Sequence, residues 1–389
     1  MTTFAPLRLP AADGRLVPYE PPAETPAYAP AAAPPRSRIA YAATHVVADP
    51  LAANGPGAPA TVDWDATLAY RRHLWAHGLG VADPLDTAQR GMGLDWAATR
   101  ELIGRAGAEA RATGGLLACG AGTDQLPPGP ARLADVIAAY EEQCEVVEAA
   151  GANVVLMASR ALAAAARAPE DYAQVYGRVL SQLSAPAILH WLGPMFDPQL
   201  DGYWSPTAPE DLDAAAEVCL AIIAEHADRI DGIKVSLLDA GREVALRERL
   251  PPGVRLYTGD DFHYPELIAG GSDALLGVFD AIAPAAAAAL GALDDGDEAR
   301  YEALFAPTVP LARELFSEPT SHYKTGIVFL AWLAGHQDHF RMVGGMESAR
   351  PVAHLARLFV LADRAGLLGD RERAAERMRL VLALAGVGA

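Results

Sequence analysis

Residues 231–279 read "DGIKVSLLDAGREVALRERLPPGVRLYTGDDFHYPELIAGGSDALLGVF", in which short apolar runs alternate with longer amphipathic segments. The apolar runs, at 231–237, 253–259 and 272–279, have the length of buried strands and are bounded by turn residues such as Gly and Asp. Strands that alternate with helix-length segments are typical of parallel β–α units. The stretch therefore predicts part of a parallel sheet that is covered by helices.

The same rhythm extends towards the N-terminus, where further apolar runs occur at 38–47, 78–85, 116–122, 153–159 and 186–192. The segments between the runs include 63–78, 131–151 and 208–230, and several of them open on Asp, Ser or Pro and close on Gly, as capped helices do. Eight β–α units in about 250 residues match the size of a (β/α)8 TIM barrel. A doubly wound open sheet is the main alternative, but the GxGxxG turn that such sheets usually carry does not follow the first strand. The sequence predicts the barrel.

The segments outside this pattern predict two additions to the barrel. Residues 1–37 are rich in Pro and Ala without an apolar period, so we expect an extended arm that wraps a surface or a neighbouring subunit. Residues 38–293 hold the β–α units. Residues 294–389 have an almost wholly helical pattern and predict a helical extension packed on the barrel. Such extensions commonly form subunit contacts, and we expect a homo-oligomer, either a dimer or a tetramer.

Composition limits the classes of partner. The net charge is −18, from 31 basic and 49 acidic residues, which argues against nucleic acid and against an anionic membrane surface as partners. The longest apolar run, 281–293, is too short to span a bilayer. Cys119, Cys144 and Cys219 show no CxxC spacing, and no secretory signal is visible at the N-terminus, so we expect a cytoplasmic protein in a reducing compartment.

Lys234 lies in the middle of the apolar run at 231–237. A buried ammonium costs several kcal/mol unless it is paired or neutralised. Side chains alternate along a strand, so if Ile233 and Val235 face the helices, Lys234 and Ser236 face the barrel interior. Adjacent strands are about 4.8 Å apart, so His190 on the preceding strand can meet Lys234 there. Burial would lower the pKa of the lysine to give an amine that adds to carbonyls, and an imidazole can move the protons that this chemistry requires.

Other polar residues stand at the carboxyl ends of the strands, where barrels place their chemistry. They are Thr44, His45, Asp86, Thr87, Ser159, Arg160, Asp260, Asp261 and His263. Structural roles stay open for several candidates, including Asp86, which could be a turn residue. Lys234 could pair with a carboxylate such as Asp260, and His190 could be a hydrogen-bonded core histidine. Asp260 and Asp261 could turn the chain and cap a helix that begins near Pro265.

The motifs at these positions resemble a known superfamily. "GIK" at 232–234, "GDD" at 259–261 and the "GG" that follows are similar to the Schiff-base region of the dihydrodipicolinate synthase / N-acetylneuraminate lyase superfamily. "PAILHWLGP" at 186–194 and "FSEPTSHYKTGI" at 316–327 fall where that superfamily has "PVILYNVPG" and its "NPxPVK" helix, so the resemblance covers about residues 38–335. It implies a TIM barrel, usually in a homotetramer, and lysine-dependent aldol chemistry on 2-keto acids, with Lys234 as the Schiff-base residue.

The chain departs from the superfamily pattern at the groups that surround the lysine. His190 occupies the place of the superfamily's proton-shuttling tyrosine, and "DPLDTAQR" retains Thr87 where the carboxylate-binding loop has two threonines. The arginine that usually follows the fifth strand is absent from "GPMFDPQLDGYW", and Arg160 is the candidate cation from another strand. The chain therefore resembles an outlying bacterial branch, and we expect it to act on a sugar-derived keto compound rather than on pyruvate.

The leading hypothesis is a class I aldolase-type lyase that needs neither cofactor nor metal. Lys234 and His190 are its predicted catalytic residues. The predicted substrate-binding residues are His45, Asp86, Thr87, Arg160, Ser236, Gly259, Asp260 and Asp261. One alternative is a metal-dependent isomerase or aldolase acting on a sugar. Its candidate ligands show no HxH or HExxH spacing and are His45, His190, Asp260, Asp261 and His263. The other is a barrel that binds a sugar or an effector without converting it. The role of Lys324 stays open.

Overall fold

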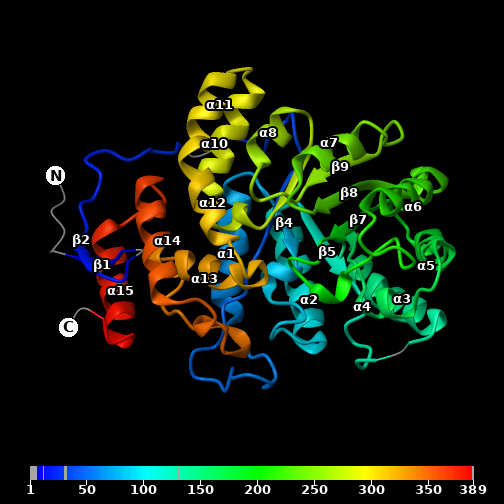
Figure 1. The fold of residues 1–389 in the computed structure, drawn as a ribbon, viewed down its shortest axis with the longest axis horizontal. Helices are drawn as coiled ribbons and strands as arrows, with labels where there is room; N and C mark the ends of the chain where they lie inside the picture. Colours follow the sequence, from blue (N-terminus) through cyan, green and yellow to red (C-terminus); the bar gives the residue numbers. More distant parts are fainter. Residues whose placement is uncertain (1–6, 12, 30–32, 130, 388–389) are drawn as a thin grey trace. The chain divides into compact units, whose positions relative to one another are not determined.

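The computed structural model describes residues 7–11, 13–29, 33–129 and 131–387, and the chain divides into two compact units. The barrel unit consists of residues 38–44 and 80–277, and the helical unit consists of residues 1–37, 45–79 and 278–389. The division at residues 37 and 293, expected from the sequence, stays a prediction. Figure 1 labels many of the elements of both units.

Eight parallel strands, all within the described residues of the barrel unit, close into a barrel and confirm the predicted fold (Figure 1). Their order around the barrel is β10, β3, β4, β5, β6, β7, β8 and β9, and β9 pairs with β10. Every run that the sequence marked as a strand overlaps one of them. Their bounds are Ala40–Ala43 for β3, Gly80–Asp83 for β4, Leu117–Ala121 for β5, Asn153–Leu156 for β6, Ala187–Leu192 for β7, Ile230–Ser236 for β8, Arg255–Thr258 for β9 and Asp273–Leu276 for β10.

The barrel interior is filled by side chains rather than left as a pore. Its buried apolar cluster contains Tyr41, Ala43, Ala82, Leu85, Ala118, Val155, Ile188, Tyr257 and Leu275. Two large rings among small residues fit a narrow barrel, because the facing positions are too close together for a large side chain on every strand. Tyr257 also donates a hydrogen bond through its hydroxyl group to Asp231 Oδ2 at 2.5 Å.

Helices of the barrel unit pack on the outside of the strands. In the structure, α2 contacts β4 and β5, α3 contacts β5 and β6, and α7 and α8 contact β9. Caps set their ends as the sequence predicted: Asp95 Oδ1 accepts from the N–H of Ala98 at the start of α2, and Gly114 ends that helix with a φ of 71°. The bounds are Trp96–Thr113 for α2, Leu133–Ala149 for α3, Arg160–Ala165 for α4, Pro169–Gln182 for α5, Leu212–Glu225 for α6, Ala240–Arg247 for α7 and Tyr264–Ala269 for α8, with short 3-10 turns at Asp86–Ala88 (η1), Pro198–Leu200 (η2) and Ala227–Arg229 (η3).

The helical unit contains the C-terminal helices that the sequence predicted. Here α13 packs on α14 and α15, and α12 packs on α14. The bounds are Trp64–Ala76 for α1, Val278–Ala281 for α9, Ala283–Asp294 for α10, Glu298–Phe305 for α11, Val309–Leu315 for α12, Tyr323–Ala334 for α13, Val352–Arg364 for α14 and Arg371–Leu384 for α15, with 3-10 turns at Ala306–Thr308 (η4), Thr320–His322 (η5) and Val343–Ser348 (η6). Across the described ranges, every helix is too short or too polar to cross a membrane.

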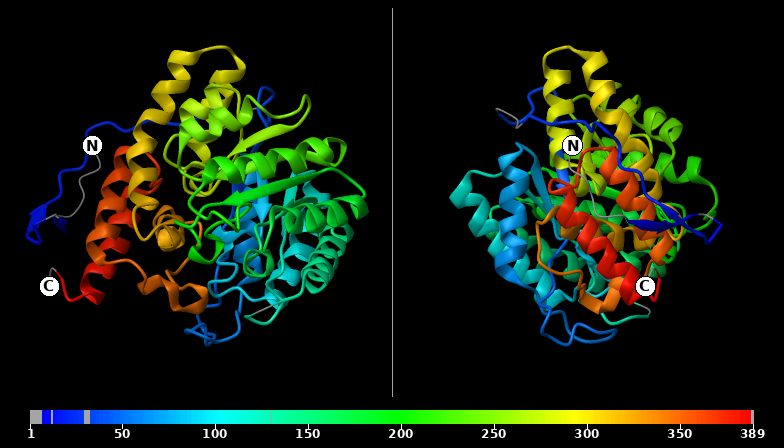
Figure 2. Two further views of the ribbon diagram at one scale, coloured as in Figure 1. Left: turned by 45° about the vertical axis from the view of Figure 1, so that its right-hand side comes forward. Right: turned by 90° about the vertical axis from the view of Figure 1, so that its left-hand side faces the viewer.

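The N-terminal arm is more ordered than its composition suggests. The strands β1 (Arg8–Pro10) and β2 (Leu16–Pro18) form a small antiparallel hairpin, and β1 contacts α14 (Figure 2). Beyond the hairpin, Tyr19 donates a hydrogen bond to Asp363 Oδ2 at 2.6 Å, and Tyr28 donates one to the carbonyl oxygen of Ala365 at 2.6 Å. The described part of the arm therefore wraps the C-terminal helices of its own chain, and its contact with a neighbouring subunit stays a prediction.

Candidate active site at the ends of strands β7, β8 and β9

Lys234 and His190 stand side by side in the barrel wall, because β7 and β8 pair in the register that places His190 opposite Lys234. Their chain neighbours, Trp191 and Val235, line a groove together with side chains of α6 and α7, and so face the helices. Alternation along the strands then turns Lys234 and His190 towards the interior, as the sequence analysis inferred. Both are buried, with 4% of Lys234 and 0% of His190 exposed to solvent.

The pKa of Lys234 lies below its ordinary value, chiefly because burial disfavours the ammonium form. The carboxylates of Asp86 and Asp261 act in the opposite direction, through longer-range attraction. Among the residues that the structure describes, none makes a hydrogen bond or an ion pair with Lys234 Nζ. A buried amine that no carboxylate holds in direct contact is available for addition to a carbonyl.

His190 is a neutral imidazole at ordinary pH. Burial is the largest cause of its low pKa, the neighbouring Lys234 lowers it further, and Asp86 raises it. Its Nε2 atom lies 3.3 Å from Ser236 Oγ, and its Nδ1 atom has no hydrogen-bond partner within the described ranges. A buried ring nitrogen without a partner is unusual in a core histidine, since buried polar atoms are nearly always satisfied. The histidine thus has a free position for exchanging a proton with a bound molecule.

Gly259 provides the space in which Lys234 lies. It follows β9, and a Cβ atom at this position would lie 2.2 Å from Ser236 Oγ and 2.8 Å from Lys234 Cε. Contacts this short require the strands or the lysine side chain to move. Gly259 therefore sets the position of the lysine by its lack of a side chain, whereas the sequence had suggested only a place near the substrate.

The two acids of the "GDD" segment have different surroundings. Asp260 Oδ1 accepts hydrogen bonds from the N–H groups of Phe262 and His263 at 2.9 and 3.1 Å, and Oδ2 lies 2.9 Å from His263 Nδ1. The Asp260 carboxylate thus holds the turn before α8, which is the structural role that the sequence left open. Asp261 is buried and acts on the charge of Lys234.

The remaining predicted residues separate into two groups. Asp86, at the start of η1 directly after β4, acts electrostatically on both Lys234 and His190, and Thr87 beside it is buried. Arg160, at the start of α4, forms an ion pair with Asp197 at 2.5 Å, so its guanidinium group already has an anionic partner.

His45 belongs to the helical unit, where Nδ1 lies 2.8 Å from Asp280 Oδ2 and Nε2 lies 3.2 Å from Gln337 Oε1. The structure therefore gathers Asp86, Ser236, Gly259 and Asp261 around the pair formed by Lys234 and His190. It finds no group of three or more His, Cys, Asp or Glu side chains suited to a metal ion in the part of the chain that it describes.

Backbone strain marks the same end of the barrel. Within the described residues, the non-glycine residues with positive φ are Gln89, Trp204 and Leu238, at 65°, 75° and 55°. They lie in the segments that follow β4, β7 and β8 respectively. Such conformations cost roughly 1–3 kcal/mol each and tend to cluster at functional sites. No residue type in these segments signals the strain, so the sequence could not have located it.

Lysine is rare in this chain, which contains Lys234 and Lys324 against 29 arginines. Both lysines are buried, although lysine is normally among the most exposed residue types. Lys324 belongs to the helical unit, where Nζ donates to the carbonyl oxygen of Ser321 at 3.0 Å and lies 4.7 Å from the ring centroid of Tyr323. Lys324 is thus engaged by its own helix terminus, and Lys234 is the lysine that faces the barrel interior.

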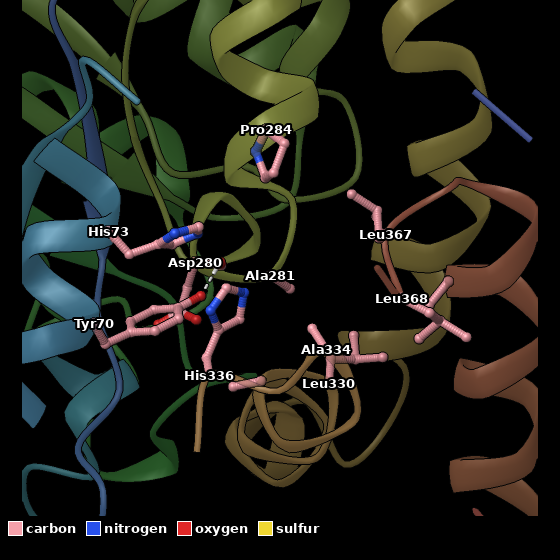
Figure 3. Close-up of a pocket in the computed structure, with 12 residues that line it drawn as sticks. Tyr70, His73, Asp280, Ala281, Pro284, Leu330, Ala334, His336, Leu367 and Leu368 are labelled. Carbon is pink, nitrogen blue, oxygen red and sulfur yellow. Dashed lines mark hydrogen bonds between the residues drawn. The ribbon is translucent and has the colours of Figure 1, made fainter. Parts of the chain in front are cut away.

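A cavity lies within the helical unit and contains a histidine cluster that no pattern in the sequence indicates (Figure 3). Tyr70 and His73 from α1 lie beside Asp280 and His336, and the rings of His73 and His336 are 4.2 Å apart. Burial is the largest cause that lowers the pKa of His73 to about 3 and that of His336 to about 4. The cavity volume is about 30 Å³.

These observations define a (β/α)8 barrel with an interior lysine on its sixth strand whose amine has no hydrogen-bond or ion-pair partner among the residues described. The chain belongs to the family described as "Protein of unknown function (DUF993)", whose model matches residues 7–387. No curated protein matches the sequence significantly.

Solved structures with the same fold come from the dihydrodipicolinate synthase group. A Pseudomonas aeruginosa protein assigned as a dihydrodipicolinate synthetase is 16% identical, with a TM-score of 0.65 over 84% of this chain and 99% of its own. A prophage protein of the dihydrodipicolinic acid synthase family from E. coli K12, solved in complex with pyruvate, is 14% identical, with a TM-score of 0.63 over 90% and 98%. The 4-hydroxy-tetrahydrodipicolinate synthase of Methylacidiphilum fumariolicum SolV is 15% identical, with a TM-score of 0.63 over 89% and 99%. The resemblance seen in the sequence motifs is thus confirmed for the fold.

Proposed function

We propose that the protein is a class I aldolase-type lyase that forms a Schiff base at Lys234. The observation that carries the proposal is the buried amine on β8, which has no partner in the described part of the chain. Its pKa is lowered by burial, and Lys234 lies in register with His190, whose pKa burial also lowers. A lysine whose neutral form is favoured in this way is a nucleophile towards ketones and aldehydes. The likeness of the barrel to dihydrodipicolinate synthases supports the proposal, because lysine chemistry of this kind is what the sequence resemblance implies.

The chemistry follows from these groups. The neutral amine adds to the substrate carbonyl carbon, and loss of water from the resulting carbinolamine gives an iminium ion. The iminium accepts the electron pair that is released when the adjacent C–C bond breaks, while a base removes the proton of the hydroxyl group on the departing carbon. His190 is suited to that proton transfer, because it is neutral and its Nδ1 atom is free among the described residues. Protonation of the enamine and hydrolysis of the iminium then restore the amine.

The substrate we propose is a sugar-derived keto compound without a carboxylate next to the carbonyl. The charged groups that act on Lys234 are the carboxylates of Asp86 and Asp261, and Arg160 is paired with Asp197. A substrate carboxylate would be repelled by the two acids, whereas substrate hydroxyl groups can donate hydrogen bonds to them. Ser236 and Thr87 are the neutral groups that we expect to contact those hydroxyls.

Borohydride trapping tests the proposal directly. Reduction in the presence of dihydroxyacetone should add one reduced adduct to Lys234, located by peptide mass spectrometry. The chain offers an unusually clear assignment, because a lysine adduct can lie only at Lys234 or Lys324. We expect Lys324→Met to leave the adduct in place and Lys234→Met to abolish it. Trapping that persists in Lys234→Met, or that fails with every hydroxyketone and 2-keto acid offered, would refute the Schiff-base assignment.

Pyruvate and dihydroxyacetone provide a matched pair of ketone probes for the substrate class. We expect dihydroxyacetone to be trapped at lower concentration than pyruvate, because only pyruvate places a carboxylate near Asp86 and Asp261. Asp261→Asn should bring the concentrations needed to trap pyruvate and dihydroxyacetone closer together, because it removes one of the two charges that repel the carboxylate of pyruvate. A preference for pyruvate in the unmodified protein would contradict the proposed substrate class while leaving the Schiff base intact.

A further inference from the structure

Glu243 lies on the helix side of the barrel wall, in α7, yet it is buried and hydrogen-bonded to the last residue of β9 and to the residue just before β10. Thr258, the last residue of β9, donates to Glu243 Oε2 at 2.9 Å, and Ser272, just before β10, donates to Oε1 at 3.0 Å. The exposed fraction of Glu243 is 1%. One carboxyl group thus joins the carboxyl end of β9 to the start of β10, on the side of the barrel wall opposite to Lys234.

The strand end that Glu243 holds carries the groups that surround the lysine. Thr258 Oγ1 also accepts the N–H of Asp260 at 3.2 Å, so the Glu243–Thr258 contact fixes the backbone on both sides of Gly259. Gly259 in turn lies against Lys234 Cε, where even a methyl group would not fit. A displacement of this turn would loosen the packing of the lysine side chain and move Asp261, which belongs to the same turn.

From these contacts we propose that Glu243 is a positioning residue of the Lys234 site. It acts through Thr258 and Gly259, keeps the turn closed against the lysine and so keeps the amine out of water. This inference rests on the proposed function, because it assigns a role in the reactivity of the same amine.

The surroundings of Glu243 also show which substitution should preserve this role. The charged groups that face it are Asp260, which disfavours its ionised form, and Arg247, which favours that form while donating hydrogen bonds to Ser272 Oγ and to the carbonyl oxygen of Leu267. Burial is the largest cause that raises the pKa of Glu243 to about 8, so the side chain is mostly neutral at pH 7. Glutamine has the same shape and no charge, and is therefore the nearer mimic, whereas alanine removes the link.

Reductive methylation with formaldehyde and cyanoborohydride measures the effect. Formaldehyde needs no substrate pocket, so the rate of methylation at Lys234, followed by peptide mass spectrometry from pH 6 to pH 10, reports the amine itself. We expect Glu243→Ala to raise the midpoint of the pH–rate curve by about one unit and to slow methylation at pH 7 about tenfold. The reason is that water reaching Lys234 would stabilise its ammonium form and raise its pKa. Glu243→Gln should stay within about twofold of the unmodified protein at pH 7.

Thr258→Val and Thr258→Ser form a second pair in case Glu243→Ala does not fold. The valine variant should behave as Glu243→Ala, and the serine variant should behave as the unmodified protein. Glu243 does not position the lysine if Glu243→Ala and Thr258→Val fold and keep the original midpoint of the pH–rate curve. The same conclusion follows if Glu243→Gln shifts that midpoint as far as Glu243→Ala does. Failure of Lys234 to react at any pH in the unmodified protein would instead refute the proposed function, so the two failures are distinguishable.

Discussion

Acidification from pH 7.5 to pH 5 is expected to destabilise the helical unit through His73. In the unfolded chain this imidazole titrates near ~6.5, whereas burial holds its pKa at about 3 in the folded protein. Because the folded pKa is the lower of the two, the contribution to stability is complete above ~6.5 and is lost as the pH falls towards 3. At pH 5 the unfolded chain has bound the proton and the folded chain has not. The difference of ~1.5 pH units corresponds to ~2 kcal/mol.

The charged and titratable groups that face His73 determine how much of this ~2 kcal/mol loss of stability is observed. His336, 4.2 Å away between ring centroids, and His77 disfavour a positive charge on His73, and Asp280 favours one. Water at the partly buried edge of the ring screens these charges, so ~2 kcal/mol is an upper value. His336, with a folded pKa of about 4, should add a similar loss over the same pH range.

Urea unfolding at the two pH values, combined with hydrogen exchange of the α1 amides, provides the measurement. We expect the unmodified protein to lose ~2 kcal/mol more than His73→Gln between pH 7.5 and pH 5, because glutamine does not titrate. His336→Gln is the matched variant at the other ring of the His73–His336 pair. It should remove the part of the acid-induced stability loss that comes from protonation of His336. If His73→Gln loses as much stability on acidification as the unmodified protein, then the neutral histidine pair is not the origin of the acid sensitivity.

Three further predictions concern single side chains. Gly259→Ala should destabilise the protein by ~1–3 kcal/mol through overpacking and should abolish borohydride trapping at Lys234. Trapping at the original rate would show that the lysine does not depend on the space that Gly259 leaves. His190→Gln should retain trapping but slow the exchange of the α-protons of dihydroxyacetone with D2O about 100-fold, as followed by NMR, whereas unchanged exchange would exclude His190 from proton transfer. Tyr19→Phe should lower the free energy of unfolding by about 1 kcal/mol in a urea titration, because Asp363 loses a buried hydrogen bond, and no change would show that the arm adds nothing at this point.

The barrel and the orientation of Lys234 could be predicted from the sequence, because both depend on short-range periodicity. Alternation along a strand places Lys234 and Ser236 on one face and Val235 on the other, whatever the distant residues are. The order of apolar runs and helix-length segments then leaves few topologies to consider. The pairing of His190 with Lys234 followed from the same argument, since consecutive strands of a barrel are neighbours.

Tertiary structure alone decided which polar groups are already engaged. The sequence made Arg160 a candidate cation, and the structure adds its ion pair with Asp197, 37 residues away in the chain. Asp260 turned out to hold its own turn, and Glu243, an unremarkable helix residue in the sequence, joins two strands from outside the barrel. The histidine cluster brings residues of α1 together with His336, far along the chain. Periodicity determines which way a side chain faces, but its partners come from segments that meet only when the chain is folded, so their contacts leave no pattern in the sequence.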